Sequence, residues 1–226
     1  MTEAEWLSCA DPGPMLAFLY GRASDRKLRL FEVGCCRRIW HLLPDERSRM
    51  AVEVAERYAD GLASDQKLGK AADAACAVWH REMQRASAAG TWKWGNRAPP
   101  YTGAAAAYNA AIDIGWWGAA PAFREPHEIA GELTGDREAE AAAQCVLLRE
   151  IFNPFRSVPA NPPWLTPNIT ALAATIYDDR AFDIMSVLAD ALEEAGCTDP
   201  DILTHCRSPG PHVRGCWVVD AVLARG

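Results

Sequence analysis

The sequence lacks the patterns that indicate a membrane-spanning, β-rich or disulfide-bonded protein. It has no apolar run of the roughly 20 residues that a membrane helix needs. Its longest weakly charged run, TGAAAAYNAAIDIGWWGAAPAF, consists largely of Ala and Gly and contains Asn109 and Asp113. The eight cysteines form no C-x-x-C pair, and the N-terminus has neither the basic nor the apolar part of a signal peptide. We therefore expect a cytoplasmic protein with reduced thiols and no membrane segment.

The sequence also lacks the motifs of common catalytic sites and the charge of a nucleic-acid-binding protein. It contains no G-x-S-x-G, no H-E-x-x-H and no glycine-rich phosphate loop. The 23 basic and 30 acidic residues give a formal charge of -7, which disfavours nucleic acid as a partner. Residues 22–49 depart from this balance with eight basic and four acidic residues. This basic segment either meets an acidic partner or pairs with acidic residues of a neighbouring helix, and we favour the second.

Helix signals dominate the rest of the sequence. Apolar residues recur at spacings of three and four between Ser, Thr or Asp starts and Gly or Pro stops. Thr2 and Glu5 form a capping box for the first helix, and Asp45 and Ser64 are expected to cap two later helices. Gly61 is expected to end the helix that Asp45 begins. The sequence predicts an all-α fold, either a multi-helix bundle or a stack of antiparallel helical hairpins.

Two proline-containing segments, residues 91–103 and 153–167, interrupt the helix signals and are predicted to be loops. We expect a single helical domain over residues 1–226. Within it, we distinguish an N-terminal helical half, a variable segment rich in Ala and Trp, and a C-terminal helical half, over residues 1–90, 91–143 and 144–226.

Distinctive segments lie near both ends of the chain, within roughly residues 1–65 and 144–223. They include MTEAEWL, RKLRLF and CCRRIWHLL on the N-terminal side and HCRSPGPHVRGCWVVD on the C-terminal side. In these segments the chain resembles an uncharacterised protein family expanded in planctomycete bacteria. The resemblance implies a related bacterial fold with a variable middle, and it implies no activity, substrate or catalytic residue.

Four potential metal ligands lie within twenty residues near the C-terminal end: Cys197, Cys206, His212 and Cys216. Zinc is commonly held by thiolate and imidazole ligands in a tetrahedral arrangement. The predicted final helix begins at His212, so His212 and Cys216, four residues apart, would lie on the same face. The spacing C-x8-C-x5-H-x3-C predicts a zinc site with these four ligands. The alternative is that the cysteines are buried apolar residues and the histidine bonds to the backbone.

The same region suggests two other roles. His205 or His212, with a nearby cysteine or carboxylate, could serve an enzyme of unknown class, although no catalytic motif is present. Arg214, Trp217 and Asp220 are spaced three residues apart, so they would share one face of the predicted final helix. We interpret these three residues as a structural clamp that holds this helix.

Nine tryptophans are many for 226 residues, and two of them, Trp92 and Trp94, lie in the first proline-containing loop. With Arg97 and Tyr101 they form a predicted partner-binding surface, because exposed aromatic residues are enriched in interfaces. We expect a non-enzymatic interaction or regulatory protein that binds another protein through its Ala- and Trp-rich middle. The alternatives are a zinc-stabilised helical domain and an enzyme that uses His205 or His212.

Overall fold

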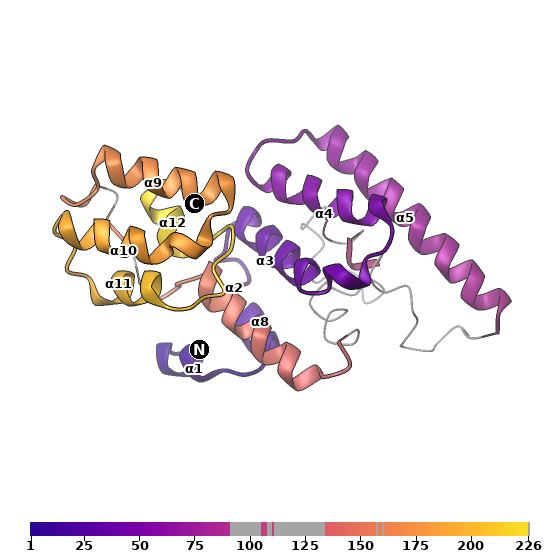
Figure 1. The fold of residues 1–226 in the computed structure, drawn as a ribbon. Helices are drawn as coiled ribbons and strands as arrows, with labels where there is room; N and C mark the ends of the chain where they lie inside the picture. The colour runs from indigo at the N-terminus through magenta and orange to yellow at the C-terminus, as the bar shows by residue number, and fades with distance from the viewer. Residues whose placement is uncertain (91–104, 108–109, 111–133, 157, 160, 226) are drawn as a thin grey trace. The chain divides into compact units, whose positions relative to one another are not determined.

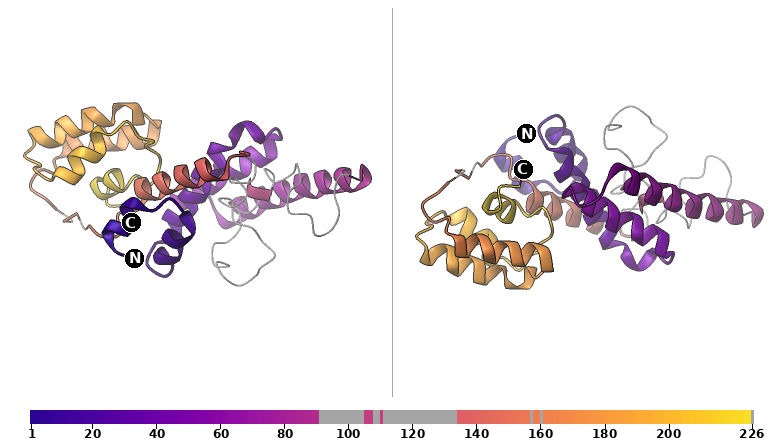
Figure 2. Two further views of the ribbon diagram at one scale, coloured as in Figure 1. Left: turned by 90° about the horizontal axis from the view of Figure 1, so that it is seen from below. Right: turned by 90° about the horizontal axis from the view of Figure 1, so that it is seen from above.

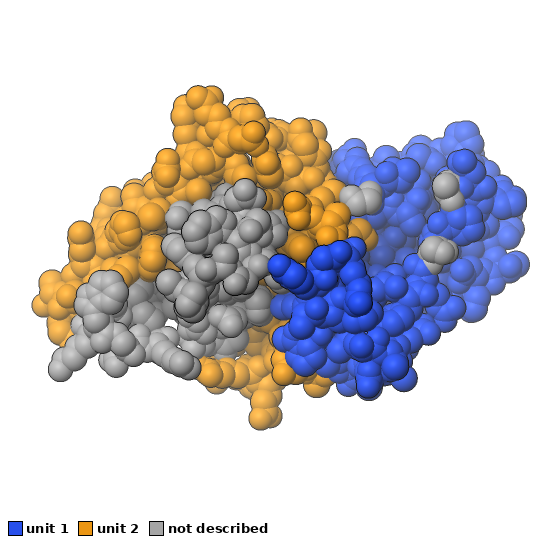
Figure 3. Space-filling model, turned by 180° about the vertical axis from the view of Figure 1, so that it is seen from behind, with its two compact units in different colours: residues 1–9, 13–22, 145–226 blue, residues 10–12, 23–144 orange. Residues whose placement is uncertain are grey.

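A computed structural model describes residues 1–90, 105–107, 110, 134–156, 158–159 and 161–225. Within these ranges the regular secondary structure is helical and there is no strand, which confirms the predicted all-α class. The chain divides into two compact units (Figure 3). Unit 1 comprises residues 1–9, 13–22 and 145–226, and unit 2 comprises residues 10–12 and 23–144. The division thus differs from the predicted halves, because most of the first 22 residues group with the C-terminal part.

In the described part of unit 2, the longest helices are α3 (Asp25–Arg38), α4 (Glu46–Ala59) and α5 (Asp65–Ala88). A short 3-10 helix, η1 (Trp40–Leu42), follows α3. Helix α4 packs against both α3 and α5, and α5 extends well beyond it (Figures 1 and 2). Asp45 and Ser64 cap α4 and α5 as predicted. At the end of α4, Gly61 has a φ of 72° and donates to the carbonyl of Tyr58, which is the expected glycine stop.

Several arginines of the basic segment are paired inside unit 2. Arg26 bonds Asp60 and Arg37 bonds Glu56, with nitrogen–oxygen distances of 3.0 and 2.9 Å. Arg38 makes a bidentate contact with Glu140 of α8 (Arg137–Ile151). The prediction that this basic segment pairs with acidic residues of neighbouring helices is confirmed for these three arginines.

The C-terminal part of unit 1 is a cluster of four helices: α9 (Pro167–Asp179), α10 (Met185–Glu194), α11 (Pro200–Arg207) and α12 (Trp217–Val222). A 3-10 helix, η3 (Phe182–Ile184), joins α9 to α10. Contacts of α9 with α10 and α12, and of α11 with α10 and α12, bring the four helices together (Figure 1). Their facing sides form a core that includes Ile176, Leu188 and Val219.

The N-terminal helices are α1 (Glu3–Ser8) and α2 (Pro12–Leu19). Although they lie far from the four C-terminal helices in the sequence, most of their residues also belong to unit 1. The capping box of Thr2 and Glu5 is present at α1, as predicted. Arg149 in the last turn of α8 donates to the carbonyl oxygens of Trp6 and Cys9 at 2.9 and 3.1 Å. Residues about 140 positions apart are therefore joined at this end of α8.

The final helix begins five residues later than predicted. Residues 208–216 form a loop and turn, and α12 starts at Trp217. Gly215 has a φ of 90°, a conformation that L side chains rarely adopt, and it lies in the turn before the helix. His212 and Cys216 consequently do not share a helix face, and Arg214 lies outside α12.

None of the helices in the described ranges is both long enough and apolar enough to span a membrane.

Candidate metal centre

Four side chains of unit 1 bring potential metal ligands together: Glu150, His205, His212 and Cys216. Glu150 lies in the last turn of α8 and His205 in the last turn of α11, while His212 and Cys216 come from the loop before α12. One ligand atom from each residue lies within 4.8 Å of those of the other three. We call these four residues the Glu-His-His-Cys cluster.

The cluster is almost closed to solvent. The side chains of Glu150 and His212 are 5% and 4% exposed, and Cys216 is fully buried. His205 is the most accessible member, with 14% of its side chain exposed. Polar groups buried to this degree require partners, because an unsatisfied buried polar group costs about 1–3 kcal/mol.

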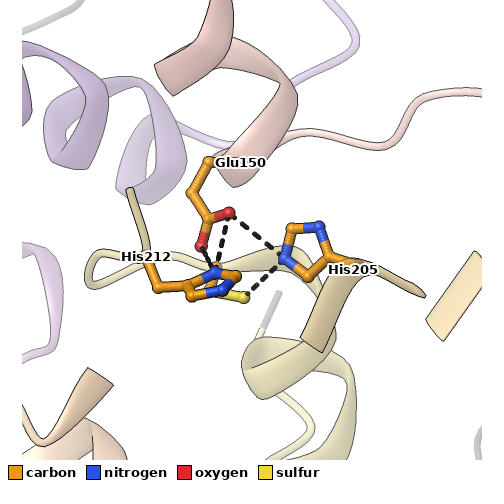
Figure 4. A group of neighbouring side chains, drawn as sticks. Glu150, His205 and His212 are labelled. Atoms are coloured by element: carbon orange, nitrogen blue, oxygen red, sulfur yellow. Dashed lines mark hydrogen bonds and ion pairs between the residues drawn. The ribbon is translucent and has the colours of Figure 1, made fainter. Parts of the chain in front are cut away.

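The Glu150 carboxylate lies between the two imidazole rings (Figure 4). Nδ1 of His212 is 3.1 Å from Oε1 and 3.2 Å from Oε2 of Glu150. Nε2 of His205 is 3.2 Å from Oε2 of Glu150 and 3.2 Å from Sγ of Cys216. The backbone N–H of Val213 also donates to Oε1 at 3.4 Å. The carboxylate is thus the centre to which the other groups point.

His212 is held between two acceptors. Its Nδ1 faces the Glu150 carboxylate, and its Nε2 is 3.2 Å from the carbonyl oxygen of Ser208. Burial opposes the charge of the imidazolium, but the hydrogen bond and charge of Glu150 raise the pKa of His212 above its ordinary value. Without a bound metal, each ring nitrogen has an acceptor within hydrogen-bond distance, an arrangement that favours the protonated ring beside the Glu150 carboxylate.

The pKa of Glu150 is shifted in the opposite direction, below its ordinary value. Burial alone would raise the pKa of its carboxyl, but the causes that oppose burial, of which the hydrogen bonds of His205 and His212 are the largest, lower that pKa. The carboxylate is therefore kept in its charged form, which is the form that ligates a metal.

The ring of His205 is oriented by Trp217. The indole Nε1 lies 3.1 Å from Nδ1 of His205 and can only donate a hydrogen bond, so Nδ1 is the acceptor. The neutral imidazole consequently carries its proton on Nε2, the nitrogen that faces Glu150 and Cys216. The ring planes of His205 and Trp217 are also in contact, with centroids 5.1 Å apart.

Cys216 is present as a thiol when no metal is bound. Burial, followed by the negative charge of Glu150, raises the pKa of this thiol well above its ordinary value. A metal ion that bound here would have to displace the thiol proton, as metal ions do when they bind cysteine.

Two of the four sequence-predicted zinc ligands, His212 and Cys216, belong to the cluster, and Cys197 and Cys206 do not. Cys197 follows the glycine that ends α10 and donates its backbone N–H to the carbonyl of Leu192. Gly196, with a φ of 93°, donates to the carbonyl of Glu193, so this is a Schellman cap in which the following residue packs inward. Cys206 is buried on α11, and burial raises the pKa of its thiol to about 12. Both are core residues of unit 1.

Sequence reasoning did not find Glu150 and His205 as partners of this loop. Glu150 precedes His212 by 62 positions, and a spacing search over the C-terminal residues cannot reach it. One signal was available: Glu150 is an acidic residue among the apolar residues Leu147, Leu148, Ile151 and Phe152, which are all buried. A buried carboxylate in such a segment requires a charged or hydrogen-bonding partner.

The three predicted clamp residues, Arg214, Trp217 and Asp220, lie in different surroundings. Arg214 lies over the ring of Tyr177, with its Cζ 5.2 Å from the ring centroid, and donates to the carbonyl of Asp178 at 3.2 Å. Trp217 donates to His205, and Asp220 is buried in the first turn of α12. Arg214 therefore attaches the turn before α12 to the end of α9.

The predicted partner-binding residues Trp92, Trp94, Arg97 and Tyr101 lie outside the described residues. The interaction function that rests on them stays a prediction.

Comparison with known proteins returned no match to a family model, a curated protein or a solved structure. The resemblance to a planctomycete family therefore stays a prediction, and the function must be argued from the cluster itself.

Proposed function

We propose that this protein binds a transition-metal ion, zinc by preference, at the Glu-His-His-Cys cluster, and that the ion stabilises unit 1. The observation that carries the proposal is the convergence of one carboxylate, two imidazoles and one thiol within 4.8 Å in a buried site. The residues come from the end of α8, the end of α11 and the loop before α12. An ion bound to them would hold three separate segments of unit 1 together.

The distances suit a four-coordinate ion. Ligand bonds of about 2.0–2.3 Å place the ligands of a tetrahedral zinc about 3.3–3.8 Å apart. Three contacts in the cluster measure 3.1–3.2 Å, and the largest separation is within 4.8 Å. Small side-chain movements are sufficient to reach tetrahedral spacing.

The donor set favours zinc over calcium or magnesium. Those two ions prefer oxygen ligands, and this cluster offers one carboxylate beside nitrogen and sulfur. The hydrogen bonds around the cluster are also those expected around metal ligands. His212 directs its Nε2 to the Ser208 carbonyl, and Glu150 accepts from the Val213 N–H, which are the outer hydrogen bonds that typically orient metal ligands.

The test measures metal content and thermal stability. We expect the purified protein to contain close to one zinc per chain. At free zinc 1,000-fold above Kd, the stabilisation is about 4 kcal/mol. A chelator should therefore lower Tm by on the order of 10 °C. Cys216→Ser should abolish stoichiometric zinc and make Tm insensitive to the chelator.

Cys197→Ala provides the matched control. Cys197 is a buried cysteine of the same unit that lies outside the cluster, so its variant should keep its zinc and its response to the chelator. Zinc that is absent from wild-type protein and is not taken up on addition would refute the proposal. Retention of stoichiometric zinc in Cys216→Ser would assign binding to residues other than the cluster.

A further inference from the structure

We infer that the metal centre has three protein ligands, Glu150, His212 and Cys216, and that its fourth position takes an exchangeable water or small anion. His205 then acts as a hydrogen-bond donor beside the metal. This inference rests on the proposed metal site and assigns the role of each of its members.

Trp217 holds His205 in the wrong tautomer for a ligand. Its Nε2 is the ring atom that faces the cluster, and a neutral ring ligates only through a nitrogen without a proton. The indole N–H of Trp217, 3.1 Å from Nδ1, fixes the neutral ring with its proton on Nε2. As a ligand, His205 would carry the proton on Nδ1, and two N–H groups would then face one another across this short distance.

His212 has the opposite arrangement. Its Nε2 donates to the Ser208 carbonyl, so the neutral ring keeps its proton on Nε2 and presents an unprotonated Nδ1 to the cluster. This is the usual state of a metal-bound histidine, whose second nitrogen donates to a carbonyl or carboxylate. The two histidines of the cluster therefore have different roles, which their outer hydrogen bonds determine.

The N–H of His205 is placed to bond the ligands. Nε2 lies 3.2 Å from both Oε2 of Glu150 and Sγ of Cys216. From this position it donates to ligand atoms or to an oxygen or nitrogen that binds the metal between them. Sites with three protein ligands and one open position are typical of zinc ions that bind water or substrate.

A cavity of unit 1 borders the cluster at His205. Its volume is about 310 Å³, and its lining includes His205, Trp217, Thr204, Trp6 and Phe152. His205 is the one cluster member among the residues that line this cavity. His205 is also the most exposed member of the cluster, so we infer that an exchangeable ligand approaches the metal past its ring.

Cobalt substitution with azide as the probe tests this inference. Cobalt(II) replaces zinc and reports ligation by visible absorption, including a charge-transfer band from the Cys216 thiolate. We expect azide to change the visible spectrum of the cobalt protein saturably, with one azide per metal. The charge-transfer band should persist, because azide adds at the open position and leaves the thiolate in place.

His205→Gln is the informative variant, because glutamine can accept from Trp217 and still donate toward Glu150. We expect this variant to bind one cobalt per chain and to respond to azide. Its metal affinity should fall by at most about 10–100-fold, the usual effect of losing an outer hydrogen-bond partner. His80→Gln, which changes a histidine of α5 outside the cluster, should leave metal affinity unchanged.

The outcomes separate this inference from the proposed function. A wild-type protein that binds no cobalt would refute the metal site itself. A wild-type protein that binds cobalt with the thiolate band but does not respond to azide would refute only the open position. Loss of stoichiometric cobalt in His205→Gln, as in Cys216→Ser, would make His205 the fourth ligand. The azide titration of wild-type protein needs no variant, so the inference stays testable if His205→Gln does not fold.

Discussion

At the scale of single residues, Arg38 and Glu140 show how unit 2 accommodates a buried charge. The Glu140 carboxylate is 2% exposed. It accepts from Nε of Arg38 at 2.9 and 3.1 Å, from Nη2 of Arg38 at 2.8 Å, and from the side-chain amide of Gln144. The hydrogen bond to Glu140 raises the pKa of Arg38. Loss of the guanidinium would leave the carboxylate buried beside a single neutral donor.

We expect Arg38→Met to lower the free energy of unfolding by about 2–3 kcal/mol. Removal of one partner from a fully buried pair costs about 3–5 kcal/mol, and the effect here is smaller because the Arg38 side chain is 37% exposed. Arg47→Met is the control, since Arg47 pairs with Asp45 near the surface and such pairs contribute about 0–1 kcal/mol. Urea denaturation measures both variants, and equal losses would contradict this difference.

Single residues also mark the limit of sequence-based prediction for the metal centre. His212 and Cys216 were predicted because they lie close together in a segment rich in potential ligands. Glu150 was missed because its contact with them depends on how α8 docks in unit 1, which no local pattern encodes. His205 was predicted only as a candidate catalytic residue and not as a metal ligand, and its contacts with Glu150 and Cys216 depend on the tertiary fold.

At the scale of helices, the local sequence predicted the helix ends better than it predicted the members of the metal centre. The caps of α1, α4 and α5 depend on side chains that bond backbone groups two or three residues away, so the sequence alone determines them. The start of α12 was misplaced because the apolar spacing of four around Gly215 also fits a turn. The positive φ of Gly215 favours the turn, and spacing alone does not reveal it.

Asp45 gives a prediction at this scale. Its side chain caps α4 by accepting from the backbone N–H of Arg47 at 3.0 Å and also accepts from Nε of Arg47 at 2.9 Å. Asp45→Ala should lower the free energy of unfolding by about 1 kcal/mol at pH 7, the usual effect of losing a cap. Asp45→Asn should have a smaller effect, because the amide oxygen still accepts from the backbone.

The effect of Asp45→Asn should depend on pH with a definite sign. The hydrogen bond from the Arg47 side chain is the main cause that lowers the pKa of Asp45 below the reference value of 3.8. A lowered folded-state pKa stabilises the protein above the unfolded-state value, and this contribution disappears as pH falls through the folded-state value. Denaturation of both proteins from pH 7 to pH 3 should show wild type and Asp45→Asn converging in stability as pH falls. A gap that widens toward acidic pH would contradict this assignment.

At the scale of the whole molecule, the division into two units determines how far the effect of the metal extends. All four cluster residues belong to unit 1, whereas α4 and α5 belong to unit 2. The sequence predicted the all-α class but placed residues 1–22 with the N-terminal half. Their grouping with unit 1 depends on long-range contacts such as those of Arg149 with Trp6 and Cys9, which helix periodicity does not encode.

Metal removal should therefore destabilise the molecule unevenly, and amide hydrogen exchange read by mass spectrometry can measure this. Regions open with their own free energies, so exchange should accelerate in the segments that contribute to the cluster or flank it: the last turn of α8, α11 and α12. For amides whose exchange requires unit 1 to unfold, the exchange rate should increase on the order of 10³-fold. This increase corresponds to the loss of about 4 kcal/mol of unfolding free energy, which is the stabilisation that zinc gives at 1,000 times its Kd. Exchange in α4 and α5 should change much less, because both helices belong to unit 2 and all four cluster residues belong to unit 1. Cys216→Ser should reproduce the pattern of chelated wild type without chelator, and equal acceleration in both units would mean that they unfold as one cooperative body.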